Sequence, residues 1–143
     1  MLERYETSDD RPGLSSAAKA LLIDPGSGTS PFLNRAVASA KKGAALEPHN
    51  PWALLAESLA EFRSGDHSQA LATLTKIETE FPSCRSASLA IQTMATHSLG
   101  NSEQAAELLR RTESALAKFD RVWFNQLAAQ MLCEEARNLI GVE

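Results

Sequence analysis

The sequence predicts an all-α protein built from short antiparallel helical hairpins that stack on one another. Apolar residues recur three and four positions apart in successive segments, which is the spacing of one helix face, and no segment shows the alternation typical of a strand. Aromatic residues make up only 6% of the chain, while alanine and leucine dominate, and this balance favours helix over sheet. Two turns led by Gly65 and Gly100 lie one step of 35 residues apart, a repeat length typical of helical solenoids.

Seven helices are expected in order along the chain, after a flexible tail or linker at residues 1–13. They cover approximately residues 14–23, 31–46, 52–64, 67–81, 84–99, 102–119 and 121–140. The Gly- and Pro-containing segment 24–28 ends the first helix. Ser30 is the expected cap of the second helix, and Pro31 opens it, because a proline at the first helical position lacks an N–H that would be unbonded anyway. The inner face of the second helix comprises Leu33, Ala36, Val37, Ala40 and Ala44.

The third and fourth helices form the clearest hairpin. The third carries a stripe at helical spacing, comprising Trp52, Leu55, Ala56, Leu59 and Phe62. Gly65 supplies a left-handed stop. Asp66 caps the fourth helix, and Gln69 follows it at the spacing of a capping box. The fourth helix turns Ala70, Leu71, Leu74 and Ile77 inward and is expected to end before Pro82.

The fifth and sixth helices repeat this arrangement, with a stop and cap at Gly100-Asn101 and Gln104 three residues later. Their inner faces comprise Ala87, Ala90, Ile91, Met94 and Ala95, and then Ala105, Leu108, Leu109, Thr112 and Leu116. Asp120 caps a seventh helix that we expect to seal the last hairpin with a broad apolar face. That face comprises Trp123, Phe124, Leu127, Ala128, Met131, Leu132, Ala136, Leu139 and Ile140. Together the helices predict one domain over residues 14–141.

Charge and composition restrict the function classes. A net charge of -4 gives no basic surface for nucleic acid or an anionic membrane. No apolar run approaches the ~20 residues that a membrane span needs, and the charged N-terminus lacks the apolar core of a secretory signal. Cys84 and Cys133 are therefore expected to be reduced thiols in a cytoplasmic protein. A chain cut from a larger protein would carry no targeting information.

The segment 31–119 resembles the tetratricopeptide repeat family. Trp52, Leu55 and Ala56 give its W-x2-L-(G/A) pattern, Ala70 is its small residue early in the second helix, and Pro82 closes the unit. In the preceding unit Ala36, Ala40 and Pro48 match the second helix. The sequence departs from the pattern where Glu57 and Glu61 replace Leu and Tyr, and where Leu89 and Ala117 replace Trp and Pro. The resemblance implies an α-α superhelix whose concave surface binds a peptide or a partner helix.

A closer similarity is to the tetratricopeptide-like tails found C-terminal to bacterial serine/threonine kinase domains. It depends on N-P-W before the third helix, A-E-F-R-S-G-D at the first glycine turn, and the closing W-F-N-Q-L-A-A-Q-M-L-C-E-E-A-R-N-L-I. The resemblance implies an accessory or regulatory binding region rather than an enzyme.

Nothing in the sequence predicts catalysis, a metal or a cofactor. Asp66-His67-Ser68 lie consecutively at a helix start, so they cannot form the chain of hydrogen bonds that a catalytic triad needs. His49 and His97 are far from any second pair of metal ligands, and the glycine-rich segment 25–30 lacks the lysine that ends a phosphate loop. We therefore expect a non-enzymatic protein.

The expected function is binding of a protein or peptide, without nucleic acid or membrane. The candidate partner-binding residues are the polar positions expected to be exposed on the third and fifth helices, namely Glu57, Glu61, Arg63, Ser88, Gln92 and Thr96. Glu57 and Glu61 are either solvated or line the inner surface, where they would attract a basic segment. The alternative function is structural: self-association as a homodimer, or docking onto a parent chain, through Trp52 or an exposed part of the seventh helix.

Overall fold

The computed structural model describes residues 22–24, 26, 29, 31–77, 82–118 and 124–141. Within these residues the secondary structure is helical and contains no strand, which confirms the all-α prediction there. The helices are α3 (Leu33–Leu46), α4 (Pro51–Arg63), α5 (His67–Leu74), α6 (Pro82–Ser98), α7 (Ser102–Leu116) and α8 (Phe124–Ile140). The expected tail, most of the expected first helix, and the expected capping residues Ser30 and Asp120 lie outside the described residues.

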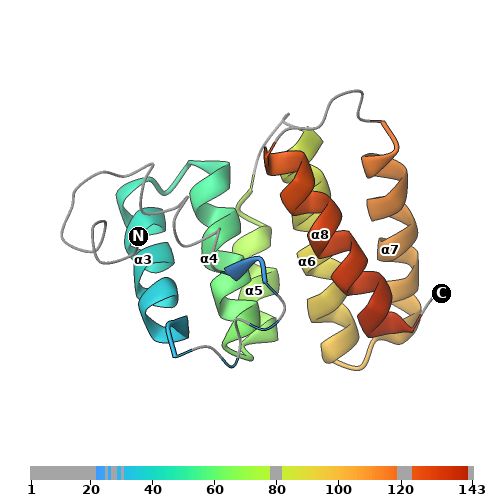
Figure 1. The fold of residues 1–143 in the computed structure, drawn as a ribbon, viewed down its shortest axis with the longest axis horizontal. Helices are drawn as coiled ribbons and strands as arrows, with labels where there is room; N and C mark the ends of the chain where they lie inside the picture. Colours follow the sequence, from blue (N-terminus) through green and yellow to red (C-terminus); the bar gives the residue numbers. More distant parts are fainter. Residues whose placement is uncertain are drawn as a thin grey trace. The chain divides into compact units, whose positions relative to one another are not determined.

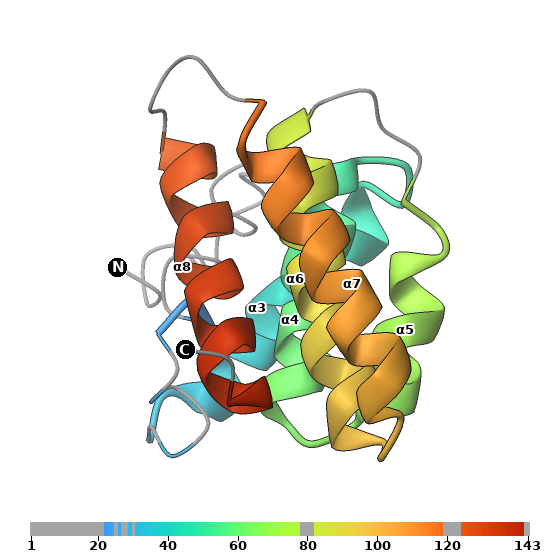
Figure 2. The same ribbon diagram turned by 90° about the vertical axis from the view of Figure 1, so that its right-hand side faces the viewer.

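The helices fall into two compact units, residues 1–78 and residues 79–143. In the first unit α4 packs against both α3 and α5, with α3 and α4 antiparallel across a short turn (Figure 1). In the second unit α6, α7 and α8 each pack against the other two (Figure 2). The single domain expected over residues 14–141 stays a prediction.

Two helix starts in the first unit are fixed by side-chain caps. At α4 the Asn50 side chain accepts a hydrogen bond from the Trp52 backbone N–H at 3.0 Å, and Pro51 occupies the first helical position. At α5 the Asp66 carboxylate accepts a hydrogen bond from the Gln69 N–H at 3.2 Å, which confirms the predicted cap. By contrast, α3 begins two residues after the predicted Pro31 and has no side-chain cap.

The predicted glycine stop of α4 is confirmed. Gly65 has φ 86°, in the left-handed region that glycine enters at no steric cost. The Asp66 N–H donates to the Glu61 carbonyl at 2.9 Å, and the Gly65 N–H donates to the Phe62 carbonyl at 3.0 Å. This pair of bonds is the Schellman motif, which satisfies carbonyl groups that the helix end would otherwise leave unbonded.

The stop of α6 has the same construction. Gly100 has φ 89°, the Asn101 N–H donates to the Thr96 carbonyl at 3.1 Å, and the Gly100 N–H donates to the His97 carbonyl at 2.9 Å. The Asn101 side chain, however, makes no cap hydrogen bond to α7, so the predicted repeat of the side-chain cap is wrong. The backbone geometry of the turn therefore repeats, while the capping chemistry of its second residue does not.

Each unit has its own buried core. The largest fully buried side chains of the first unit include Leu22, Leu55 and Leu59, and those of the second include Ile91, Met94 and Leu132. Ala70 of α5 and Ala105 of α7, the small residues at corresponding places after the two turns, are both fully buried. Burial of each large apolar side chain contributes about 1.5–3 kcal/mol to folding.

Two expectations about helix extent and burial are wrong. The fourth predicted helix was expected to continue to residue 81, but α5 ends at Leu74. The Lys76 N–H there bonds to the carbonyl three residues earlier, at Thr73, in a tightened last turn, and the Thr75 hydroxyl bonds to the Ala72 carbonyl. In α8 the expected inward face includes three side chains that are exposed: Leu127, Met131 and Leu139. The helices α6 and α7 cover only one side of α8, so its apolar arc is wider than the surface available to bury it.

Candidate functional site

The predicted binding positions on α4 differ in exposure. Glu57 is half-buried, whereas Glu61 is 6% exposed, so the expectation that Glu61 is solvent-accessible is wrong. Arg63 is half-buried and its guanidinium group donates hydrogen bonds to the backbone carbonyls of Leu22, at 2.9 Å, and Ile23, at 3.3 Å. Arg63 thus ties α4 to the residues that precede α3 instead of standing free on a surface.

The predicted positions on α6 divide in the same way. Ser88 and Gln92 are half-buried, but Thr96 is 3% exposed, so its expected exposure is also wrong. The Ser88 hydroxyl donates to the Cys84 carbonyl of its own helix at 2.8 Å. The partly exposed members of the predicted set are therefore Glu57, Arg63, Ser88 and Gln92.

The two errors have one cause. Sequence periodicity predicts one apolar stripe per helix, with the polar residues outside it facing water. Both α4 and α6, however, are covered by two neighbours, α4 by α3 and α5, and α6 by α7 and α8. A helix covered on two sides buries most of its circumference, and small or polar side chains at the edges of the stripe are enclosed with it.

Burial changes the protonation of Glu61. Desolvation raises the pKa of its carboxyl group above the ordinary 4.5, and the negative charges of Glu57 and Asp66 act in the same direction. The Thr73 hydroxyl and the Lys41 ammonium group oppose the shift. Glu61 is therefore a weaker site for attracting a basic partner than an exposed glutamate would be.

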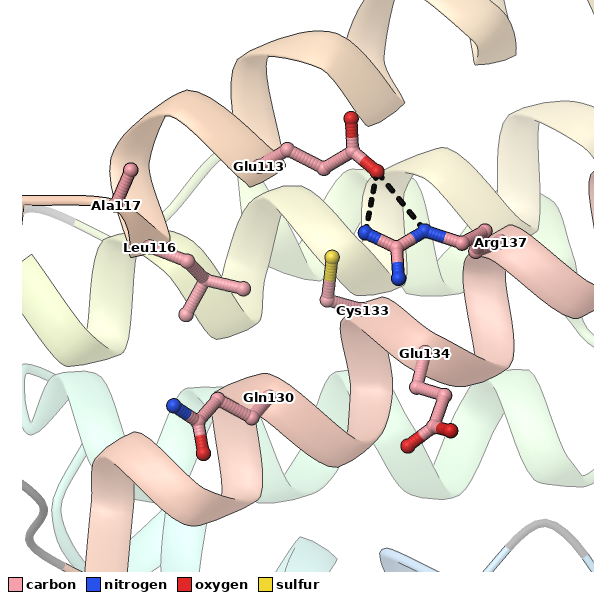
Figure 3. A pocket seen from close by; sticks show the side chains of 7 residues that line it. All are labelled: Glu113, Leu116, Ala117, Gln130, Cys133, Glu134 and Arg137. Carbon is pink, nitrogen blue, oxygen red and sulfur yellow. Dashed lines mark hydrogen bonds and ion pairs between the residues drawn. The ribbon is translucent and has the colours of Figure 1, made fainter. Parts of the chain in front are cut away.

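A separate site lies within the second unit. An open groove of about 500 Å³ runs between the C-terminal part of α7 and the middle of α8 (Figure 3). From α7 it is lined by Glu113, Leu116 and Ala117, and from α8 by Gln130, Cys133, Glu134 and Arg137. The α8 residues recur at intervals of three and four, so that one helix face supplies all of them.

An ion pair crosses the groove. Arg137 donates from Nε at 3.0 Å and from Nη2 at 2.6 Å, both to the Oε1 atom of Glu113 (Figure 3). Both side chains are less than half exposed. The hydrogen bond and the charge of Glu113 raise the pKa of Arg137. The pair therefore fixes the spacing of α7 and α8 along one wall of the groove.

The Cys133 thiol points from α8 toward α7 beside this ion pair (Figure 3). Burial raises the pKa of the thiol; Arg137 lowers it, while Glu113 and Glu134 raise it further. Because the thiolate is the nucleophilic form, a raised pKa lowers the fraction of Cys133 that is nucleophilic at neutral pH. The second cysteine, Cys84, is also a free, buried thiol.

No signal in the sequence identifies this groove. Glu113 and Arg137 are 24 residues apart, and only the packing register of α7 against α8 brings them together. Among the described residues no three His, Cys, Asp or Glu side chains cluster closely enough to hold a metal ion. A membrane-crossing helix would need to be longer and more apolar than any in the described ranges.

The chain matches no protein-family model, no curated protein and no solved structure.

Proposed function

We propose that the chain is a non-catalytic interaction module in which helical hairpins stack as successive units of a tetratricopeptide-like solenoid and bind a segment of a partner protein. The partner is a peptide or a helix that binds polar surface positions on a first helix of a hairpin, α4 or α6. This module belongs in the cytoplasm, and its sequence resemblance favours an accessory role in a larger bacterial protein such as a serine/threonine kinase.

The observation that carries the proposal is the correspondence between the hairpins α4–α5 and α6–α7. Each first helix ends in a glycine at φ near 90°, with the same two backbone hydrogen bonds. Each second helix begins immediately afterwards and buries an alanine, Ala70 or Ala105, at the same distance from the glycine. Repeated hairpins of this kind cannot bury their apolar faces alone and are stabilised by stacking on neighbours.

The polar surface of the first helices supports binding rather than catalysis. Glu57 and Gln92 lie partly exposed on α4 and α6, and they offer a carboxylate and an amide to a partner's backbone or side chains. A catalytic site needs a nucleophile or base oriented by a further group. His67, the histidine between Asp66 and Ser68, packs against Phe62 with tilted rings whose centroids are 5.1 Å apart, an arrangement that serves packing.

The proposal can be tested by selecting, from a displayed library of random peptides, those that bind the immobilised full-length chain. We expect enriched peptides that bind in solution and lose affinity when their sequence is scrambled. Charge reversal at the half-buried Glu57 (Glu57→Lys) should weaken those that dock on α4, with the exposed Glu103→Lys on α7 as the matched control. Failure to enrich any peptide that binds better than its scrambled version would refute the interaction module.

One observation favours the alternative function, self-association. Leu127 and Met131 lie one turn apart on α8 and are 46% and 39% exposed, so this helix presents apolar surface outside its own unit. Light scattering after size exclusion distinguishes the alternatives. An apparent mass that rises with protein concentration, and that stays at the monomer value in the Met131→Glu variant, would indicate self-association. A monomer mass at every concentration would favour binding of a different protein.

A further inference from the structure

The groove between α7 and α8 carries an excess of negative charge. Glu113 and Arg137 neutralise each other through the two bonds to Glu113 Oε1. Glu134, which is exposed at the rim of the same groove, is the remaining charged residue of the lining. Its carboxylate is close enough to raise the pKa values of both Cys133 and Arg137. The lining thus has a net charge of one negative unit.

The end of α7 adds to this charge. The helix terminates at Leu116, inside the lining, and its last bonded N–H groups belong to Ala117 and Lys118. Carbonyl groups at a helix C-terminus carry the negative end of the helix dipole, and they favour a cation by a few tenths to about 1 kcal/mol near the surface. An anionic ligand would meet this end and the Glu134 carboxylate, whereas a cationic ligand would be attracted by both.

We propose that the α7/α8 groove binds a lysine or arginine side chain presented by a partner protein. The aliphatic stem of such a side chain packs on Leu116 and Ala117, and its charged end lies beside Glu134. Arg137 does not repel it strongly, because Glu113 already holds the guanidinium group. This inference rests on the proposed interaction function and names the chemistry of the partner.

The groove can be tested without knowing the partner. The probe is N-acetyl-argininamide, titrated into the isotope-labelled full-length chain while backbone amide shifts are followed by NMR. We expect saturable shifts at residues 113–117 and 130–137, and much smaller ones with N-acetyl-citrullinamide, which has nearly the same shape without the charge. Glu134→Gln should weaken argininamide binding roughly two- to fivefold, the range of an exposed ion pair. Glu103→Gln, on an exposed part of α7 outside the groove, should leave it unchanged.

Equal binding of the citrulline compound, an unchanged affinity in Glu134→Gln, or the absence of shifts in these ranges would overturn the groove assignment. The result is independent of the peptide selection that tests the module. Enriched peptides that bind without perturbing α7 and α8 would refute the groove while leaving the module in place. A selection that enriches nothing would refute the module, even where argininamide enters the groove.

Discussion

The carboxyl group of Glu61 on α4 lies beside the hydroxyl group of Thr73 on α5, and both are buried. Neither Glu61 Oε2 nor Thr73 Oγ1 has a well-formed hydrogen bond within the described part of the chain. The hydroxyl nevertheless opposes the rise in the Glu61 pKa that burial causes. The hydroxyl group can donate to the carboxylate, and a hydrogen bond of that kind favours the charged form. Burial acts in the opposite direction and is the larger effect, so the surroundings as a whole favour the neutral form of Glu61.

This relationship predicts how stability depends on pH. Because the folded state raises the pKa of Glu61, the folded chain binds its proton more tightly than the unfolded chain does. The stability gained in this way is fully present below about 4.5, the ordinary pKa, and is lost as the pH rises through the folded pKa. Glu61→Gln should remove this component and raise the unfolding free energy at neutral pH, because the neutral amide can donate to Thr73. Urea denaturation across this pH range measures the effect.

The exposed glutamate Glu103 provides the control for this experiment. Glu103→Gln should leave the pH profile of the wild type unchanged. A Glu61→Gln profile that is parallel to the wild-type profile would show that Glu61 titrates normally in the folded chain.

The left-handed glycines give a second prediction. Gly65→Ala and Gly100→Ala should each lower the unfolding free energy by about 1–2 kcal/mol, the cost of an L-residue in this conformation. A Cβ atom would meet nothing within 4 Å at either position, so the whole loss would come from the backbone. Gly26, which lacks a positive φ and is exposed, is the control, and Gly26→Ala should change stability by less than about 0.5 kcal/mol. Equal effects at all three glycines would contradict the shared turn geometry.

Two leucines on α8 give a third prediction, which concerns the side of the helix that packs against its neighbours. Leu132 is 1% exposed and Leu127 is 46% exposed. Leu132→Ala should cost about 2–5 kcal/mol through lost burial and the cavity left behind. Leu127→Ala should cost less than about 0.5 kcal/mol in the free chain. Thermal or urea unfolding of both variants measures this, and a large loss for Leu127→Ala would show that this side chain is covered.

The sequence predicted what local chemistry determines. Helix type followed from apolar spacing, and the stops at Gly65 and Gly100 followed from the conformational freedom of glycine. The cap at Asp66 followed from a side chain that can reach its own backbone three residues on. These features need no knowledge of how helices pack, and for this reason they were predicted with the fewest errors.

Features that depend on packing were missed. Glu61 and Thr96 are buried where their helices meet neighbouring helices, and Leu127 is exposed on a part of α8 that its neighbours leave uncovered. Neither condition is visible in the periodicity of a single helix. The groove lined by Glu113 and Arg137 requires the register between two helices, which the sequence alone does not supply.

The ion pair between Glu113 and Arg137 gives the last prediction. A double-mutant cycle with Glu113→Gln and Arg137→Gln should show favourable coupling, because two hydrogen bonds hold the guanidinium group to one carboxylate oxygen across two helices. The pair between Glu107 and Arg110, within α7 and more exposed, is the control and should couple more weakly. Added salt should reduce both couplings, and that of the exposed pair by the larger fraction. Equal coupling in the two pairs would mean that Glu113 and Arg137 do not hold α7 and α8 together, and the groove would then lack a fixed wall.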